Sequence, residues 1–212
     1  MRKIVILISG RGSNMQALLS AQLPCKIAAV ISNKADAIGL VFATQHGIPT
    51  QVVAHRDYVD RAAFDVALAQ AIDRYQPDFI VLAGFMRILT EQFVNRYRGR
   101  LINIHPSLLP AYAGMHTHER ALQDGVKIHG CTVHFVTADL DHGPIIIQAA
   151  VPVLAGDTAQ TLAQRVLQQE HIVYPQAIGW LCAGTINLNA EGRVTSSLKE
   201  QTAAALISPG LE

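Results

Sequence analysis

Short apolar runs alternate with longer amphipathic stretches through the first half of the chain. Five runs have the length and composition of buried strands, the last of them more weakly than the others: 3–8 (KIVILI), 26–32 (KIAAVIS), 79–85 (FIVLAGF), 100–104 (RLINI) and 50–53 (TQVV). The stretches between them have helical character: 14–22, 39–47, 60–76 and 91–97. Nearly all-apolar strands that alternate with helices predict a Rossmann-like α/β fold, in which a mostly parallel sheet is covered by helices on both faces.

The second half of the chain has a different pattern. Residues 130–136 alternate between apolar and polar, 137–143 have the composition of a loop, and 144–153 resume an extended pattern. Together they predict a C-terminal antiparallel hairpin added to the sheet. A long amphipathic helix is expected over 158–182, and Pro175 should kink or split it because proline lacks the N–H that a helix interior needs.

Composition excludes several classes of protein. Half of the 212 residues are apolar, and 17 Lys and Arg against 16 Asp and Glu leave a net charge of +1, so neither a nucleic-acid footprint nor a membrane-surface patch is indicated. A small anionic ligand remains open. Cys25, Cys131 and Cys182 are far apart and form no C-x-x-C pair, which favours a reducing, cytoplasmic location. The apolar start MRKIVILISG is too short for a signal peptide, and no run approaches the roughly 18 residues of a membrane span.

The segment SGRGSN (9–14) lies between the first predicted strand and the first predicted helix. Exposed N–H groups and the helix dipole favour an anion at such a place, so the more specific interpretation is a binding site for a phosphomonoester. Gly10 and Gly12 let the backbone approach it, and Ser13 or Asn14 could cap the helix. The segment matches neither the dinucleotide fingerprint nor the Walker loop, and a tight glycine turn without a ligand is the alternative.

Asn103 and His105 stand two residues apart at the end of a predicted inner strand, so both side chains should point to one face. Asp141 belongs to an independent loop with glycine and proline just after it. These three groups form a coherent set for acyl transfer. The amide can stabilise an oxyanion, the imidazole can move a proton, and the carboxylate can orient or charge that imidazole. The alternative is a polar strand end that neighbouring backbone satisfies.

Several histidines suggest a metal site, but they lack the spacing of a known ligand motif, and we expect no bound metal: His116, His118, His129, His134 and His142. His134 should share a strand face with Thr132 and serve as a hydrogen-bonded core or supporting residue. Arg61 and Arg87 could be ordinary surface charges, although Arg87 follows a buried strand and so belongs to the same carboxyl edge.

Taken together, these stretches resemble the phosphoribosylglycinamide formyltransferase family, the folate-dependent enzymes of purine synthesis. The resemblance extends to about Asn187 and is carried by motifs in the expected order: ISGRGSNMQAL, ISNKADAIGL, VLAGFMRIL, LINIHPSLLPAY, GMHTHERAL, HGCTVHFVTADLDHGPII and QEHIVYP. It implies one formyltransferase domain over 1–188, with a phosphate-binding half (1–100) and a catalytic, folate-binding half (101–188). The weakly patterned tail, 189–212, is expected to be mobile.

The resemblance also implies roles for individual residues. Asn103, His105 and Asp141 would form the catalytic trio, and Glu170 would help to hold the ribose and glycinamide end of the substrate. The substrate phosphate would be bound by Arg11, Gly12, Ser13 and Asn14. The pocket for the co-substrate 10-formyltetrahydrofolate would be lined by Arg61, Met86, Arg87, Ile88, Leu89, Asn103, Thr137, Ala138, Asp139, Leu140 and Asp141.

The implied reaction is a direct transfer. The amine of glycinamide ribonucleotide would attack the formyl carbon, Asn103 and protonated His105 would stabilise the oxyanion, and Asp141 would favour the charged imidazole. Both partners are small molecules, neither nucleic acid nor a membrane is expected, and a homodimer remains open. The chain departs from the family at Ala111 and Ala113, where lysine and proline are frequent, and at His142, where glycine is usual.

Three rival interpretations share parts of this pattern. Formyltetrahydrofolate hydrolases normally carry a regulatory domain before this sheet, and methionyl-tRNA formyltransferases carry a further domain for tRNA. This chain begins at the first strand of the sheet and ends early without a basic face, so both are less favoured. The third rival is a catalytically silent sensor of a phosphate-bearing ligand, against which Asn103, His105 and Asp141 argue.

Overall fold

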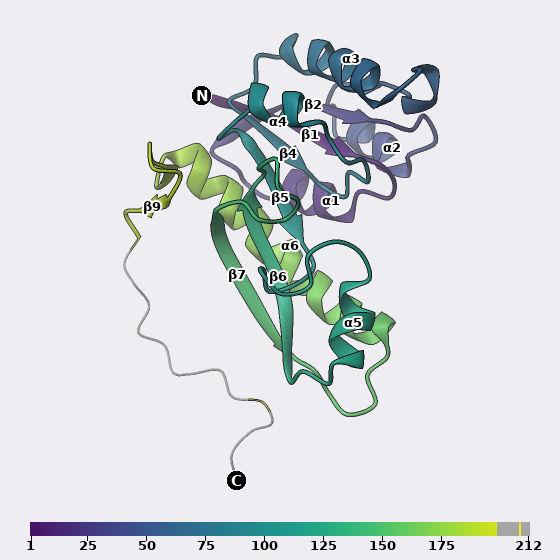
Figure 1. Cartoon of the computed structure of the whole chain (residues 1–212). Helices are drawn as coiled ribbons and strands as arrows, with labels where there is room; N and C mark the ends of the chain where they lie inside the picture. Colours follow the sequence, from purple (N-terminus) through teal and green to yellow (C-terminus); the bar gives the residue numbers. More distant parts are fainter. Residues whose placement is uncertain (199–207, 209–212) are drawn as a thin grey trace.

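A seven-stranded sheet, with strand order β3-β2-β1-β4-β5-β6-β7, forms the centre of the protein (Figure 1). The computed structural model describes residues 1–198 and 208. The strands of this sheet are β1 (Arg2–Ile8), β2 (Cys25–Ser32), β3 (Thr50–Val52), β4 (Phe79–Leu82), β5 (Leu101–His105), β6 (Ile128–Phe135) and β7 (Ile145–Pro152). β1 to β5 are parallel, whereas β6 and β7 pair antiparallel. The predicted α/β class with an added antiparallel hairpin is confirmed.

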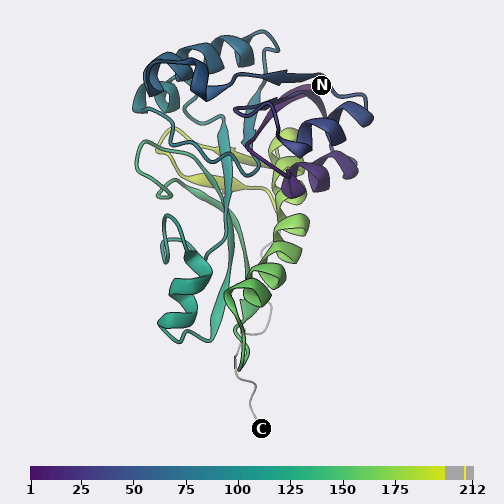
Figure 2. The same ribbon diagram turned by 90° about the vertical axis from the view of Figure 1, so that its right-hand side faces the viewer.

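Helices cover both faces of the sheet (Figure 2). One face carries α1 (Ser13–Ser20), α2 (Ile38–Gln45) and the long α6 (Ala159–Ala183), and the other carries α3 (Arg61–Asp73) and α4 (Glu91–Arg96). Because strand side chains alternate, β1 sends Ile4, Ile6 and Ile8 into the first core and Val5 and Leu7 into the second. This double burial explains why the inner strands are apolar at nearly every position.

The order of the strands reverses between β1 and β4, and this reversal determines where a ligand can enter. β1 is flanked by β2 on one side and by β4 on the other, so the connections that leave β1 and β4 diverge to opposite faces. In open α/β sheets such a switch point, at the carboxyl ends of the strands, leaves a crevice between the diverging connections. The loop after β1 and the segment after β4 therefore flank the natural binding position.

α6 runs without interruption through Pro175, so the predicted split of this helix is wrong. Tyr174, which is fully buried, donates its hydroxyl to the carbonyls of Leu82 at 2.9 Å and Ile102 at 3.2 Å. These hydrogen bonds and the apolar face of α6 hold the helix against β4 and β5. Tertiary packing thus outweighs the cost of one proline.

Two local elements were not expected from the sequence. A short helix, α5 (Thr117–Gln123), occupies the stretch between β5 and β6, and a small hairpin forms from β8 (Ile186–Leu188) and β9 (Val194–Ser196). The first residues of the predicted tail therefore belong to this hairpin. The remainder of that tail, 199–207 and 209–212, lies outside the described residues. Within the described part of the chain, none of the helices combines the length and the apolar character that a membrane span requires.

Candidate active site

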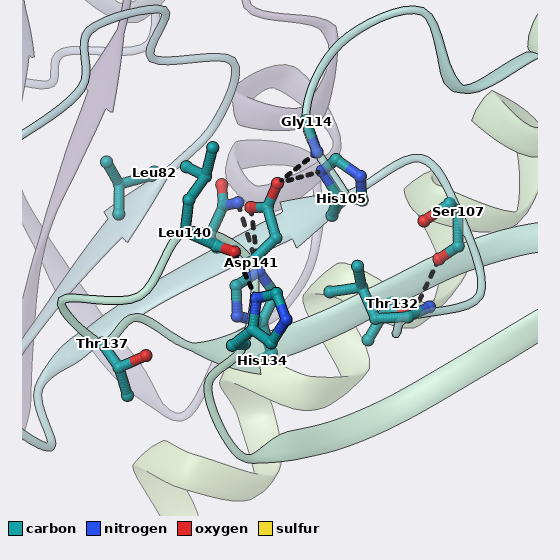
Figure 3. Close-up of polar contacts among 12 residues, drawn as sticks. Leu82, His105, Ser107, Gly114, Thr132, His134, Thr137, Leu140 and Asp141 are labelled. Atoms are coloured by element: carbon teal, nitrogen blue, oxygen red, sulfur yellow. Dashed lines mark hydrogen bonds and ion pairs between the residues drawn. The ribbon is translucent and has the colours of Figure 1, made fainter. Parts of the chain in front are cut away.

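Asn103 and His105 lie at the carboxyl end of β5, where the parallel part of the sheet meets the antiparallel part. Figure 3 shows His105 with Asp141 and His134 around it. On β6 their cross-strand partners are His134 and Thr132. His105 is only 6% exposed. Asp141 reaches the same place from the loop between β6 and β7 and lies between His105 and His134. The structure thus brings together the three residues predicted to form a trio.

The loop that carries Asp141 is held in a fixed conformation. Asp141 has φ 56°, a left-handed value that costs free energy for a residue with a side chain. Gly143 lies so close to β6 that a Cβ atom there would be 1.7 Å from the carbonyl oxygen of Phe135. The Asp141 carboxylate also accepts the backbone N–H of Gly114 at 2.9 Å. This contact ties the Asp141 loop to the segment after β5.

Both nitrogens of the His105 ring face oxygen atoms. Nε2 lies 2.9 Å from the carbonyl oxygen of Tyr112, which can only accept, and Nδ1 lies 3.4 Å from Oδ2 of Asp141. A neutral imidazole has one bare nitrogen, and either tautomer would turn it toward an oxygen lone pair. Each ring nitrogen therefore has an oxygen acceptor close by, and one of the two is a carboxylate oxygen.

His134 is 1% exposed, and burial lowers its pKa, which favours the neutral ring. Its Nδ1 lies 2.9 Å from the carbonyl oxygen of Phe135, which places the proton on Nδ1 and leaves Nε2 as an acceptor. The amide nitrogen of Asn103 lies 3.4 Å from that Nε2. His134 therefore turns the NH₂ group of Asn103 in one direction and leaves its second N–H free to donate.

The glycine-rich segment after β1 forms the start of α1. The predicted cap by Ser13 or Asn14 is wrong: the N-cap is Gly12, which has φ 72° and no side chain, and α1 begins at Ser13. The side chain of Asn14 instead points inward and donates to Oε2 of Glu170 at 2.7 Å. Glu170 comes from α6 and is 7% exposed, and burial raises its pKa while the hydrogen bond from Asn14 opposes that shift.

The loop after β1 and Glu170 form one polar region, joined by Asn14. Oδ1 of Asn14 is buried and has no partner among the described residues, while Arg11 is exposed. The N–H groups at the start of a helix are orphan donors, and they add positive potential there. The region thus offers donors for a phosphate and a carboxylate for hydroxyl or amine groups.

The residues predicted for the folate pocket surround the same edge but are more exposed. Met86 and Ile88, after β4, are 63% and 59% exposed, and the guanidinium of Arg87 lies 5.8 Å from the ring centre of Phe64. Arg61 is exposed at the first position of α3. In the loop before Asp141, the four residues predicted to line the pocket are exposed: Thr137, Ala138, Asp139 and Leu140. No contact among them assigns a ligand.

A model of the formyl transferase family matches residues 2–178. The chain is also 51% identical over 190 residues to the phosphoribosylglycinamide formyltransferase of Escherichia coli (strain K12), and the match covers 88% of this chain and 90% of that protein. The chain belongs to the phosphoribosylglycinamide formyltransferases, within the formyl transferase family.

Other members of the family extend the comparison. The chain is 47% identical over 196 residues to the trifunctional purine biosynthetic protein adenosine-3 of Bos taurus, where the match covers 91% of this chain but 19% of that much longer protein. The phosphoribosylglycinamide formyltransferase of Coxiella burnetii, solved in complex with CHES, is 49% identical with a TM-score of 0.88, over 92% of this chain and 93% of that chain. Sequence and structure therefore agree on a formyltransferase fold.

The positions at which the chain departs from the usual formyltransferase pattern lie around the trio. The carbonyl of Ala111 accepts from Ser107 at 2.6 Å, and that of Ala113 accepts from Arg120 at 2.7 Å, so both positions contribute backbone groups to the segment after β5. His142 is exposed, and its Nδ1 lies 2.6 Å from the carbonyl oxygen of Leu140. That contact braces the loop next to Asp141.

Sequence reasoning missed the backbone groups that hold the trio. The carbonyl of Tyr112 faces His105 and the N–H of Gly114 faces Asp141, and both belong to a segment with left-handed residues at Tyr112, Gly114 and His116. In the sequence, the glycine at the middle of these three positions was the signal for a left-handed backbone. In the part of the chain that the structure describes, no group of three or more His, Cys, Asp or Glu residues could hold a metal ion.

Proposed function

We propose that this formyltransferase moves the formyl group of 10-formyltetrahydrofolate to the amine of glycinamide ribonucleotide in purine biosynthesis. The observation that carries the proposal is the environment of His105. A ring nitrogen that faces Asp141 and another that faces a carbonyl favour an imidazolium, and the amide of Asn103 stands two residues away on the same strand. A cation and an N–H donor at one point are what a developing oxyanion requires.

The phosphate of the ribonucleotide would bind at Arg11, Gly12, Ser13 and Asn14. Gly12 at the N-cap leaves the backbone accessible, and the exposed Arg11 supplies a positive charge near the anion. Glu170, held by Asn14, would accept hydrogen bonds from the ribose or the glycinamide. Glu170 comes from α6 and the loop follows β1, so the two would contact the sugar from different sides.

The folate would bind along the carboxyl edge on the other side of the trio. Met86 and Ile88 offer apolar surface for its rings, and Arg61 and Arg87 offer positive charge for its carboxylates. The loop 137–141 would complete the pocket and deliver Asp141. Because Met86 to Leu89 and Arg61 come from the phosphate-binding half of the domain, the folate site would draw on both halves, with His105 between the two substrates.

The chemistry is an addition followed by an elimination. The nitrogen of the ribonucleotide amine forms a bond to the formyl carbon, and the carbonyl oxygen becomes an oxyanion that Asn103 and the His105 imidazolium stabilise. When the intermediate collapses, the bond from the formyl carbon to N10 of the folate breaks. The proton lost by the attacking amine passes, with help from Asp141 and water, to N10 of the departing tetrahydrofolate. No acyl-enzyme is formed.

The proposal is tested by mixing the purified protein with glycinamide ribonucleotide and 10-formyltetrahydrofolate and following both products. The expected result is equal amounts of tetrahydrofolate and formylated ribonucleotide, with neither formed when the ribonucleotide is left out. Release of formate without the ribonucleotide would mean a hydrolase instead. Saturable binding of both compounds without turnover would mean a silent sensor.

A further inference from the structure

Ser9 links the loop after β1 to the segment after β4. It is the residue immediately after β1 and before Gly10, and it is 5% exposed. Its hydroxyl accepts the backbone N–H of Met86 at 2.8 Å and donates to Oδ1 of Asn33 at 2.6 Å. An amide N–H can only donate, so the hydroxyl proton must point to Asn33. Both hydrogen-bonding directions of Ser9 are thus determined.

Asn33 provides a fixed anchor for that hydroxyl. It follows β2 and is 1% exposed. Its backbone carbonyl lies 2.8 Å from Nδ1 of His55 and accepts the backbone N–H of His55 at 3.2 Å. The backbone carbonyl of Asn33 is thus held by two groups of His55, and the side-chain amide of Asn33 keeps the Ser9 hydroxyl turned so that its lone pair faces Met86.

The segment from Met86 to Leu89 is fixed at its ends, and its side chains alternate between exposed (Met86, Ile88) and half-buried (Arg87, Leu89). Thr90, which follows it, donates its backbone N–H to Oδ2 of the buried Asp65 at 2.7 Å. Ser9 holds the other end. Between these two anchors the side chains of Met86 and Ile88 face solvent. A segment with anchored ends and exposed apolar side chains is suited to present a preformed surface to a ligand.

We propose that Ser9 is a positioning residue: through Met86 it sets the folate-binding segment Met86–Leu89 at a fixed distance from the phosphate loop that begins at Gly10. This inference rests on the proposed function. Ser9 touches neither substrate in this scheme. Its effect is geometric, because the amine and the formyl carbon come from different ligands, and a displacement of about 1 Å between reacting groups costs about 100-fold in rate.

The expected effect of Ser9→Ala follows from the lost hydrogen bond. The N–H of Met86 loses its acceptor, whereas the backbone hydrogen bond from Ser9 to Gly84 remains, so the segment is held less tightly and the KM for 10-formyltetrahydrofolate should rise about 3- to 10-fold. kcat should fall as well, because the segment also aligns the formyl group. The KM for the ribonucleotide should change less than about 2-fold, because the donors of the phosphate loop remain in place.

Ser32→Ala is the matched control. Ser32 is also fully buried at the carboxyl end of an inner strand, but its hydroxyl accepts the N–H of Lys34 within its own turn and does not reach the segment after β4. Asn33→Ala tests the path of the effect: it leaves the Ser9 hydroxyl in place but without its anchor, so the folate KM should rise as in Ser9→Ala. The double variant Ser9→Ala/Asn33→Ala should be little worse than either single variant.

The experiment combines steady-state kinetics with hydrogen exchange of the backbone amides in the absence of ligands. In Ser9→Ala, exchange over Met86 to Leu89 should become faster than in wild type, and in Ser32→Ala it should not. Unchanged exchange in that segment, or a folate KM equal to that of the control, overturns the positioning role. If the wild type shows no transfer, the proposed function fails, while the exchange comparison still decides whether Ser9 holds the segment.

Discussion

Oδ2 of Asp141 lies 3.4 Å from Nδ1 of His105, and each side chain is 8% exposed. Few water molecules can screen two groups buried to this extent. A charged imidazole in such a place is stable only with a counter-charge, and Asp141 is the carboxylate that lies beside it. The pair explains why a residue of a separate loop is needed next to the strand that carries His105.

Replacing Asp141 by Asn tests the charge while keeping the shape. The variant retains an oxygen that can accept the N–H of Gly114, but it no longer stabilises an imidazolium. We expect kcat to fall at least about 100-fold, which is the loss typical of one oxyanion-stabilising group. The measurement is turnover of a folded variant under saturating substrates, with folding checked by circular dichroism.

Asp139→Asn is the control for this experiment. It removes the same charge from the same loop, two residues earlier, where the side chain is exposed. At saturating folate its kcat should stay within about 3-fold of wild type, because its exposed charge is screened by water and salt, and its place in the proposed folate pocket should show only in the KM for 10-formyltetrahydrofolate. If both variants lose equal activity, the effect comes from the loop as a whole and the specific role of Asp141 is wrong.

Asn103→Asp removes the N–H donor of the side chain and keeps its shape. Aspartate has nearly the shape of asparagine but presents only oxygen atoms when it is ionised. It would repel a developing oxyanion where the amide stabilises it. We expect kcat to fall by about 100- to 1,000-fold, with a smaller change in the KM of the ribonucleotide, because the lost interaction forms mainly in the transition state.

A result against this role would be an Asn103→Asp enzyme with near-normal turnover. His134→Leu provides a second approach, because it removes the acceptor that turns the Asn103 amide and leaves β6 apolar. Its kcat should fall by about 10-fold, less than in Asn103→Asp, since the donor is still present but is no longer oriented. Equal losses in the two variants would point to collapse of the strand pair.

The sequence predicted the elements that carry the site because their signals are local. Apolar runs marked β1, β2, β4 and β5, and the two-residue spacing placed Asn103 and His105 at one strand end. The proximity of Asp141 could only be inferred from its chemistry and from the family resemblance. No pattern along the chain encodes a contact between residues 36 positions apart, whereas the antiparallel pairing of β5 with β6 creates it.

The missed features depend on tertiary packing. α5 is a short helix whose N-cap, His116, is left-handed and gives no side-chain cap, so its sequence lacks a start signal. α6 continues past Pro175 because Tyr174 and the apolar face of the helix hold it against the sheet. Ser9 looks like part of a glycine-rich turn in the sequence, and only the fold shows that its hydroxyl reaches Met86.

Gly12→Ala should damage the loop that we propose to bind the phosphate, and it should do so in two ways. Gly12 has φ 72°, which costs about 1–2 kcal/mol for a residue with a Cβ, and that atom would lie 2.9 Å from Cε of Met15. We expect the free energy of unfolding to fall by about 2 kcal/mol and the KM of the ribonucleotide to rise about 10-fold, because the loop that presents N–H groups is displaced. Chemical unfolding and kinetics measure the two effects.

Gly47→Ala isolates the backbone contribution. Gly47 has a similar φ of 69°, but nothing lies within 4 Å of the added Cβ. This variant should lose about 1 kcal/mol of stability and retain the wild-type KM for the ribonucleotide. If Gly12→Ala behaves in the same way as Gly47→Ala in both measurements, the loop at Gly12 is an ordinary tight turn and does not hold the phosphate.

Glu170 should make the stability of the protein depend on pH in a defined direction. Burial raises its pKa in the folded state, so the folded protein binds a proton at Glu170 more tightly than the unfolded chain does. The stability that this group contributes is therefore fully present below the pKa of the unfolded state and is lost as pH rises through the folded pKa. The loss amounts to about 1.4 kcal/mol for each unit by which the pKa is raised.

Glu170→Gln imitates the protonated acid at every pH and removes this dependence. The free energy of unfolding of the variant, relative to wild type, should rise between about pH 4 and the raised pKa and then stay constant, because only the wild type continues to bury a charge. Urea unfolding at a series of pH values measures the difference. A difference in the free energy of unfolding that does not change with pH would mean that Asn14 compensates for the burial of the carboxylate.

The same variant, Glu170→Gln, should bind the ribonucleotide more weakly at neutral pH, since an amide is a poorer acceptor than a carboxylate for hydroxyl and amine groups.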